Sequence, residues 1–288
     1  MIKENILAIP SKDRLRDESL NLMKSIAINF EYTLGWSGIR NLTSEATLIV
    51  ADANSMREWE RFTVALLRPK DIVEMVAASE IPLGIVGMDT VEEYSLSLRR
   101  NLPGDEKRVQ TLLPLGIGVC RLVLAAPQES GIKTAQEFRE AEQRGEFVSR
   151  LSIPTLEQFR GLTIATSYPR MLRRYFADAY ASLDTRDSME FSIREMIGAV
   201  EAAPALGMAG AIADLVETGT SLRDNGLREI ETIFESQAVL ITNTQNKKGD
   251  DPFVDKVRDT IFRFLLKRGN PDAIRKQQEY EEFISSYR

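Results

Sequence analysis

The 288-residue chain contains no histidine and a single cysteine, Cys120. Without histidine, serine–histidine and cysteine–histidine catalysis are excluded, and so are histidine metal sites. One cysteine can form neither an internal disulfide nor a cysteine metal cluster. The apolar run in the first residues is too short for a signal peptide, and no stretch approaches membrane-spanning length. We therefore expect a cytoplasmic protein without a membrane partner.

The chain also lacks an excess of basic residues. It has 37 Lys and Arg against 43 Asp and Glu, a formal net charge of −6. This balance argues against a protein that binds nucleic acid through bulk charge. Hydrophobic residues make up 43% and charged residues 28%, which is ordinary for a soluble globular protein. The length favours two domains.

The segment after Ala211 carries the strongest functional signal. Residues 211–216 are apolar except for Asp214, as in a short buried strand, and Thr218-Gly219-Thr220-Ser221 follows. A glycine turn of this kind can aim several backbone N–H groups at one point, and such a nest binds phosphate. Asp214 could accept hydrogen bonds from sugar hydroxyls beside the phosphate. The segment predicts a ribose-phosphate site, although the same four residues also suit an ordinary turn.

Short apolar runs alternate with amphipathic segments along the chain. Helical spacing is present in Leu15–Ile26, Ile72–Val76 and Leu172–Ala179. This alternation predicts an α/β fold, whose ligands bind at the polar turns that follow the strands. Ser167 is expected to cap a helix that begins at Pro169. The predicted buried strands are Ile6–Ile9, Val64–Leu67, Leu83–Val86, Val119–Ala126, Leu162–Ala165 and Ala238–Thr242.

Six motifs in order resemble those of the ATP phosphoribosyltransferase family. One is the segment from Glu201 through Asp214 to Ser221, where the family usually has threonine in place of Ser221. Together the motifs extend over most of residues 5–243, and their order makes the resemblance specific. The other five are Pro10–Leu15, Leu67–Ile72, Leu83–Asp89, Cys120–Ala125 and Ile164–Pro169.

The resemblance implies two α/β domains around a cleft, arranged like a type II periplasmic binding protein. Residues 1–118 and 230–288 would form the first domain with carboxyl-terminal helices. Residues 119–229 would form the second domain, which carries the phosphoribosyl-binding loop. The charged stretch 128–158 is longer than the family leads us to expect, and we interpret it as a surface insertion containing a helix.

The implied reaction transfers 5-phosphoribosyl from phosphoribosyl pyrophosphate to N1 of ATP and releases pyrophosphate, the first step of histidine biosynthesis. Asp214 and Arg68 would be catalytic. Magnesium would be the cofactor, carried by the substrate, and no residues are assigned to hold it. The phosphoribosyl pyrophosphate site would comprise Asp214, Glu217, Thr218, Gly219, Thr220, Ser221 and Leu222. The ATP site would comprise Lys12, Arg14, Arg68, Asp89 and Tyr168.

The stretch after Asn243 is too short for the ACT-type regulatory domain of the family's long form, and its apolar spacing predicts two helices. The chain therefore resembles the short form, which implies a homo-oligomer and a separate regulatory subunit related to histidyl-tRNA synthetase. We expect the chain alone to be insensitive to histidine. Two alternatives stay open. One is a small-molecule binding module of the same bilobal fold. The other is a catalytically silent paralogue, favoured by Asp13, which stands where the family usually has glycine.

Overall fold

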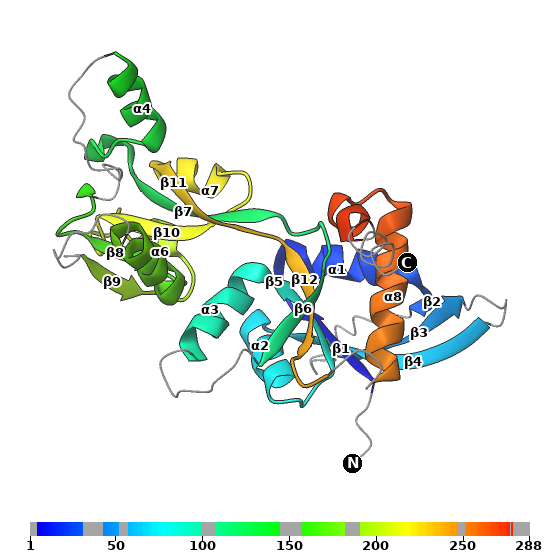
Figure 1. Cartoon of the computed structure of the whole chain (residues 1–288). Helices are drawn as coiled ribbons and strands as arrows, with labels where there is room; N and C mark the ends of the chain where they lie inside the picture. The colour runs from blue at the N-terminus through cyan, green and yellow to red at the C-terminus, as the bar shows by residue number, and fades with distance from the viewer. Residues whose placement is uncertain are drawn as a thin grey trace. The chain divides into compact units, whose positions relative to one another are not determined.

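The computed structural model describes residues 5–30, 43–51, 57–98, 108–144, 157–181, 191–246, 251–276 and 278. The chain forms two compact units (Figure 1). Unit 1 comprises Met1–Val119 and Gln237–Arg288, and unit 2 comprises Cys120–Ser236. Each unit is a sheet with helices packed on it, which confirms the expected α/β class. In the described part of the chain, no helix is long and apolar enough to cross a membrane.

The sheet of unit 1 has the strand order β2-β3-β4-β1-β5-β12-β6 among the described residues. β1 lies parallel to both β4 and β5, so these three strands end at the same edge. β12 is antiparallel to β5 and β6. The strands are β1 (Ile6–Pro10), β2 (Ala27–Phe30), β3 (Thr43–Ala51), β4 (Arg57–Leu67), β5 (Leu83–Gly87), β6 (Val109–Pro114) and β12 (Ala238–Asn243).

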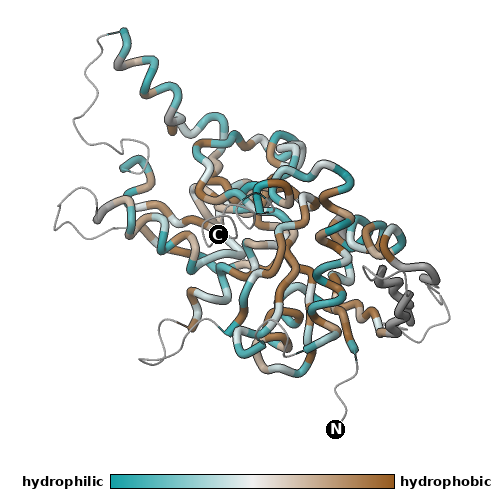
Figure 2. The backbone as a smooth tube through the Cα atoms, turned by 45° about the vertical axis from the view of Figure 1, so that its right-hand side comes forward, coloured by the Kyte–Doolittle hydropathy of each residue, from teal (hydrophilic) through white to brown (hydrophobic). Residues whose placement is uncertain are grey.

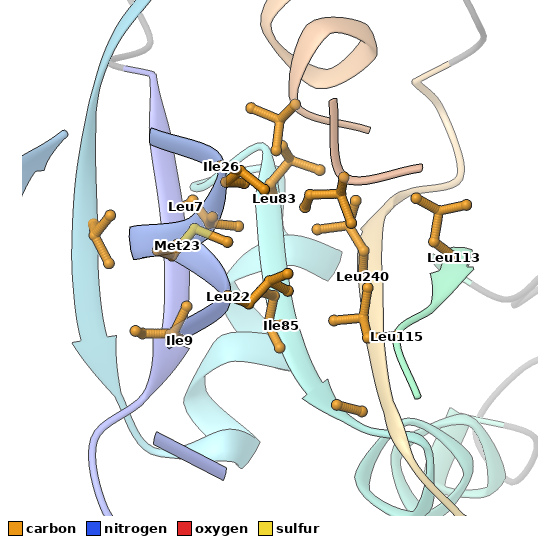
Figure 3. Packing of buried hydrophobic residues seen from close by; sticks show 14 of the residues in the cluster. Leu7, Ile9, Leu22, Met23, Ile26, Leu83, Ile85, Leu113, Leu115 and Leu240 are labelled. Atoms are coloured by element: carbon orange, nitrogen blue, oxygen red, sulfur yellow. The ribbon is translucent and has the colours of Figure 1, made fainter. Parts of the chain in front are cut away.

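Two pairs of helices cover this sheet: α1 (Asp13–Ile26) with α8 (Pro252–Lys267), and α2 (Pro69–Ala77) with α3 (Met88–Leu98). The pleat of β1 separates their cores, because neighbouring side chains point to opposite faces. Leu7 and Ile9 pack with α1 and α8 (Figure 3), whereas Ala8 packs with α2 and α3. The buried strands are therefore apolar on both faces, as parallel strands between helices require.

Unit 2 has the strand order β11-β7-β10-β8-β9. β8 is parallel to β9 and β10, and β7 is antiparallel to β10 and β11. The strands are β7 (Cys120–Pro127), β8 (Thr163–Thr166), β9 (Ser192–Glu195), β10 (Ala211–Val216) and β11 (Leu227–Ser236). The helices in the described part of this unit are η1 (Gln128–Ser130), α4 (Ala135–Gln143), α6 (Pro169–Ala181), η2 (Val200–Ala202) and α7 (Thr220–Asp224).

The boundary between the units falls later than the sequence suggests. The motifs place the return to the first domain near Ile230, but β11 stays paired with β7 as far as Ser236. The ten-residue strand β11 is the reason, since its hydrogen bonds with β7 keep all of it in unit 2.

The structure confirms the predicted strands around β1, β4, β5, β7, β8 and β12, and the predicted helices within α1, α2 and α6. The helix expected in the stretch 128–158 is present as α4, which is mainly hydrophilic (Figure 2). Residues 145–156 of that stretch lie outside the described residues, as does most of the second predicted carboxyl-terminal helix.

Candidate functional site

A glycine turn joins β10 to the short helix α7. Gly219 has φ +75°, in the left-handed region that glycine adopts without strain, and it stands at the N-cap of α7. Its carbonyl accepts a hydrogen bond from the Arg223 N–H at 3.1 Å. The N–H groups at the start of a helix have no intrahelical acceptor, so the turn can offer them to a ligand.

A cavity of about 410 Å³ lies at this turn, wholly within unit 2. All seven residues predicted for the phosphoribosyl site line it. Cys120 and Glu201 line it too, and sequence reasoning assigned neither to the site. Both residues belong to the family-like motifs of the sequence, but that they line this cavity depends on how the strands pair. The described residues that line it are Cys120, Glu201, Asp214, Leu215, Val216, Glu217, Thr218, Gly219, Thr220, Ser221 and Leu222.

Asp214 has the most altered ionisation in the cavity. Burial raises the pKa of its carboxyl group from 3.8 to about 6. The Leu215 N–H, which donates to Oδ1 at 2.9 Å, opposes this shift of the pKa, and the charge of Glu201 adds to it. Asp214 therefore takes up and releases its proton just below neutral pH, and it is ionised at pH 7.

Two threonine hydroxyls form a hydrogen-bonded pair on the turn. Oγ1 of Thr218 lies 3.1 Å from Oγ1 of Thr220. The guanidinium group of Arg223 contacts both residues: Nη1 donates to the Thr218 carbonyl and Nη2 to Thr220 Oγ1, each at 3.3 Å. Sequence reasoning missed Arg223, although its spacing of three residues from Thr220 on a helix would have placed them on one face.

Tyr168 follows β8, the strand parallel to β10, so it lies at the same sheet edge as the turn. Its N–H donates to Thr166 Oγ1 at 2.9 Å, and its side chain is half-buried. The hydroxyl of Ser167 donates to the carbonyl of Met196 at 2.7 Å, which links the end of β8 to the residue after β9. The helix cap at Ser167 stays a prediction, because a hydroxyl that donates one hydrogen bond can still accept another from a helix N–H.

Three predicted ATP-site residues gather at one edge of the unit 1 sheet. Lys12 follows β1, Arg68 follows β4 and Asp89 follows β5, and these are the three adjacent parallel strands. Lys12 and Arg68 are exposed, whereas Asp89 is 4% exposed and accepts a hydrogen bond from the Thr90 hydroxyl at 3.1 Å. The side chain of Arg14 lies outside the described residues. Asp214 and Arg68 belong to different units.

Among the residues that the structure describes, no three His, Cys, Asp or Glu side chains come together as a metal site. Three acidic residues, Glu201, Asp214 and Glu217, are nevertheless among the residues that line the cavity at the turn. Carboxylate oxygens are the ligands that magnesium prefers, and magnesium commonly takes one or two of them together with substrate phosphates. The donor chemistry of the cavity thus fits a magnesium ion held mainly by a phosphorylated substrate.

Two α/β units, with polar turns at the carboxyl ends of their parallel strands, define a two-domain α/β protein of a ligand-binding class. A sequence model of the family HisG, ATP phosphoribosyltransferase, matches residues 68–264. The chain belongs to the ATP phosphoribosyltransferase family. These pentosyltransferases catalyse the first step of histidine biosynthesis.

Individual relatives agree with this membership. The ATP phosphoribosyltransferase of Maricaulis maris is 28% identical over 274 residues, which are 95% of this chain and 74% of the relative. The enzyme of Methanopyrus kandleri is 31% identical over 244 residues, 85% of this chain and 67% of the relative. A chain of the ATP phosphoribosyl transferase (HisG:HisZ) complex from Thermotoga maritima has the same fold, with a TM-score of 0.57 and 20% identity. That match covers 89% of this chain and 98% of the other.

Proposed function

We propose that the turn Glu217–Leu222 binds the 5-phosphate of phosphoribosyl pyrophosphate during transfer of its ribosyl group to N1 of ATP. The observation that carries this assignment is the single cavity shared by the turn, its hydroxyls and Asp214. The N–H groups at the start of α7 and the hydroxyls of Thr218, Thr220 and Ser221 supply donors for a phosphate. Asp214 lines the same cavity from the end of β10, where it can accept hydrogen bonds from the ribose hydroxyls.

The reaction does not need a strong general base. Adenine N1 attacks with a lone pair that it already has, which suits a chain without histidine. The difficult event is departure of pyrophosphate from an anomeric carbon that develops positive charge. Asp214, which with a pKa of about 6 is mostly ionised at pH 7, would stabilise that charge from its half-buried position beside the sugar. Alignment of the two substrates supplies the remainder of the rate enhancement.

ATP would be held by Lys12, Arg14, Arg68, Asp89 and Tyr168. The sheet edge that unites Lys12, Arg68 and Asp89 supports this assignment, because ligands of open α/β sheets bind at the carboxyl ends of strands. The exposed guanidinium of Arg68 would neutralise the departing pyrophosphate. Magnesium, when bound to the diphosphate, supplies further neutralising charge.

We infer the assembly and the location from membership of the family. A homo-oligomer with a separate regulatory subunit related to histidyl-tRNA synthetase is our proposal for the working enzyme, located in the cytoplasm. The Thermotoga maritima structure is a complex of two components, HisG and HisZ, and this supports a partner of this kind.

The sole cysteine gives a direct test of the phosphate assignment, because Cys120 lines the proposed site. We expect saturating phosphoribosyl pyrophosphate or ribose 5-phosphate to slow maleimide labelling of Cys120. Inorganic sulfate at the same ionic strength controls for salt. If neither sugar phosphate slows the labelling of Cys120, the assignment of the 5-phosphate to this cavity is wrong.

Pyrophosphate release from ATP, phosphoribosyl pyrophosphate and magnesium is the companion assay for catalysis. We expect release by the wild-type chain and a loss of at least about tenfold in turnover in Asp214→Asn, about 1.4 kcal/mol of transition-state stabilisation. Protection of Cys120 without any pyrophosphate release would instead favour the catalytically silent paralogue.

A further inference from the structure

The charge of the residues that line the cavity at the turn is unfavourable for binding a phosphate. Three acidic residues line it, Glu201, Asp214 and Glu217, and none of its described lining residues is basic. A sugar phosphate is an anion, so the lining alone would repel it at neutral pH. Besides the N–H groups of α7 and a magnesium ion carried by the substrate, a basic side chain next to the lining can supply positive charge.

Two arginines lie next to the turn in the described structure: Arg121 is opposite Val216 in the β7–β10 pair, and Arg223 belongs to α7. Their guanidinium groups have different partners. Arg121 binds both carboxylate oxygens of Glu229 through Nη2, at 3.0 Å and 2.8 Å. That ion pair largely neutralises Arg121. Arg223 instead donates to neutral acceptors, the Thr218 carbonyl and the Thr220 hydroxyl. Its charge is therefore directed at the turn itself.

The hydroxyl pair shows what Arg223 does besides carrying charge. An arginine only donates hydrogen bonds, so Thr220 Oγ1 must accept from it. The bond between the Thr218 and Thr220 hydroxyls uses one of their two protons. The other hydroxyl proton cannot be donated to the guanidinium, because arginine has no acceptor atom. That proton remains available for a hydrogen bond to a ligand. Chains of this kind polarise each member, which strengthens the terminal donor.

We propose that Arg223 is a positioning residue of the phosphoribosyl site, which orients the Thr218–Thr220 hydroxyl pair toward the 5-phosphate and supplies positive charge that the lining lacks. The proposal rests on the assignment of the 5-phosphate to this turn. Arg223 acts through the two threonines and is itself exposed, outside the residues that line the cavity.

Three substitutions separate the charge of Arg223 from its donor role. Arg223→Met keeps length and removes both, and Arg223→Lys keeps the charge on a group that cannot span both acceptors with a planar fork. Arg223→Glu reverses the charge and adds an acceptor that would take the remaining hydroxyl proton. The matched control is Arg160→Met, an exposed arginine of the same unit paired with Glu157 at 3.3 Å.

Steady-state kinetics is the test. We expect Arg223→Met to raise the KM for phosphoribosyl pyrophosphate about tenfold, Arg223→Glu to raise it further, and Arg223→Lys to recover part of the loss. The KM for ATP and kcat should stay within about twofold of wild type, as should all constants of Arg160→Met. The melting temperatures of the variants should match, because the side chain is exposed.

Wild-type protection of Cys120 by ribose 5-phosphate, measured alongside, keeps the two hypotheses apart. If wild type shows no protection, the phosphate assignment itself fails. If wild type is protected and Arg223→Met retains the wild-type KM for phosphoribosyl pyrophosphate, the role of Arg223 is wrong while the assignment stands. A decrease in kcat together with equal increases in both KM values and a lower melting temperature would also overturn the proposal, since Arg223 would then only stabilise the fold.

Discussion

Gln237 donates a hydrogen bond from Nε2 to Oδ2 of Asp272, at 3.0 Å. Gln237 is the first residue of unit 1 after the chain leaves unit 2, and Asp272 lies in the helical turn that begins at Pro271. The amide Oε1 of Gln237 accepts from the Gly116 N–H at 2.8 Å, and its backbone carbonyl accepts from the Met88 N–H at 2.9 Å. Gln237 thus connects the segment before β7, where the chain leaves unit 1, with the segment after β11, where it returns. It also holds the start of α3 and the helical turn at Pro271.

We expect Gln237→Ala to lower the free energy of unfolding by about 1 kcal/mol, because it removes both side-chain hydrogen bonds, to the Gly116 N–H and to Asp272. Urea denaturation followed by circular dichroism measures the change. Gln245→Ala, an exposed glutamine of the same unit, is the control and should unfold like wild type. Coincident unfolding curves for Gln237→Ala and wild type would show that the amide adds no stability.

Two glycines on either side of α7 form a matched pair for testing the turn. Gly219 has φ +75° and Gly226 has φ +67°, so alanine at either position costs about 1–2 kcal/mol of backbone strain. A Cβ atom on Gly219 would also lie 3.1 Å from Arg223 Nη1 and 3.2 Å from Glu229 Oε1. On Gly226 it would meet no described atom within 4 Å.

Gly219→Ala should therefore raise the KM for phosphoribosyl pyrophosphate by about tenfold, since the turn and Arg223 must shift. Gly226→Ala should lose similar stability and keep that KM within about twofold. Steady-state kinetics and thermal unfolding of both variants measure the two effects. The same KM in the two variants would mean that strain alone, and not the geometry of the turn, accounts for the effect.

The turn could be predicted from the sequence because its signal is local. Asp214, the hydroxyls and Gly219 stand within eight residues, and a strand that runs into a glycine turn places them together whatever the remainder of the fold. Arg68 and Asp89 could be brought together only through a family resemblance. Their shared sheet edge depends on which strands pair with β1.

The sequence was least informative about β11 and the residues it positions. Register shifts between Glu229 and Glu231 and between Thr232 and Phe234 break the alternation of apolar and polar residues that marks a strand. Buried Leu227 and Ile230 are consequently three residues apart. Glu229 meets Arg121 only because β11 pairs with β7, and no local pattern reports such a contact.

A second set of contacts from β11 holds the helix α4. Arg228 pairs with Glu137, with Nη1 at 3.1 Å from Oε1, and also donates to the carbonyl of Ile132. Glu137 and Thr134 form a reciprocal cap: the Thr134 N–H donates to Glu137 Oε2 at 2.6 Å, and the Glu137 N–H donates to Thr134 Oγ1 at 3.1 Å. The backbone hydrogen bond from Thr134, with help from Arg228, lowers the pKa of Glu137.

We expect Thr134→Ala to reduce the hydrogen-exchange protection of α4 about fivefold, the equivalent of about 1 kcal/mol for a lost helix cap. Because the folded-state pKa of Glu137 is lowered, its contribution is present above the unfolded value of 4.5 and is lost as the pH falls through the folded value. Glu140→Gln on the same helix is the control. Wild-type exchange in Thr134→Ala would show that Arg228 alone holds the helix.

The pKa of Asp214 predicts opposite effects of pH on stability and on catalysis. In the folded protein this pKa is about 6, against 3.8 for the ordinary group, so between these values the folded state binds more protons than the unfolded state. The contribution of Asp214 to the free energy of unfolding is therefore fully present below about pH 4. It falls as the pH rises from about 4 to about 6 and is lost above the folded pKa. Catalysis should gain over the same range, because the ionised carboxylate is the form proposed to stabilise the sugar cation.

We therefore expect kcat/KM for phosphoribosyl pyrophosphate to rise along a limb with a pKa near 6, and Asp214→Asn to abolish both this limb and the matching decrease in stability. Denaturant unfolding and kinetics at several pH values between about 4 and 8 measure the two effects. Asp178→Asn, an exposed aspartate of the same unit paired with Arg174, should retain the wild-type profiles. If Asp214→Asn keeps the wild-type pH dependence of unfolding, the Asp214 carboxyl group does not titrate near pH 6. The rise in kcat/KM with pH must then belong to another residue.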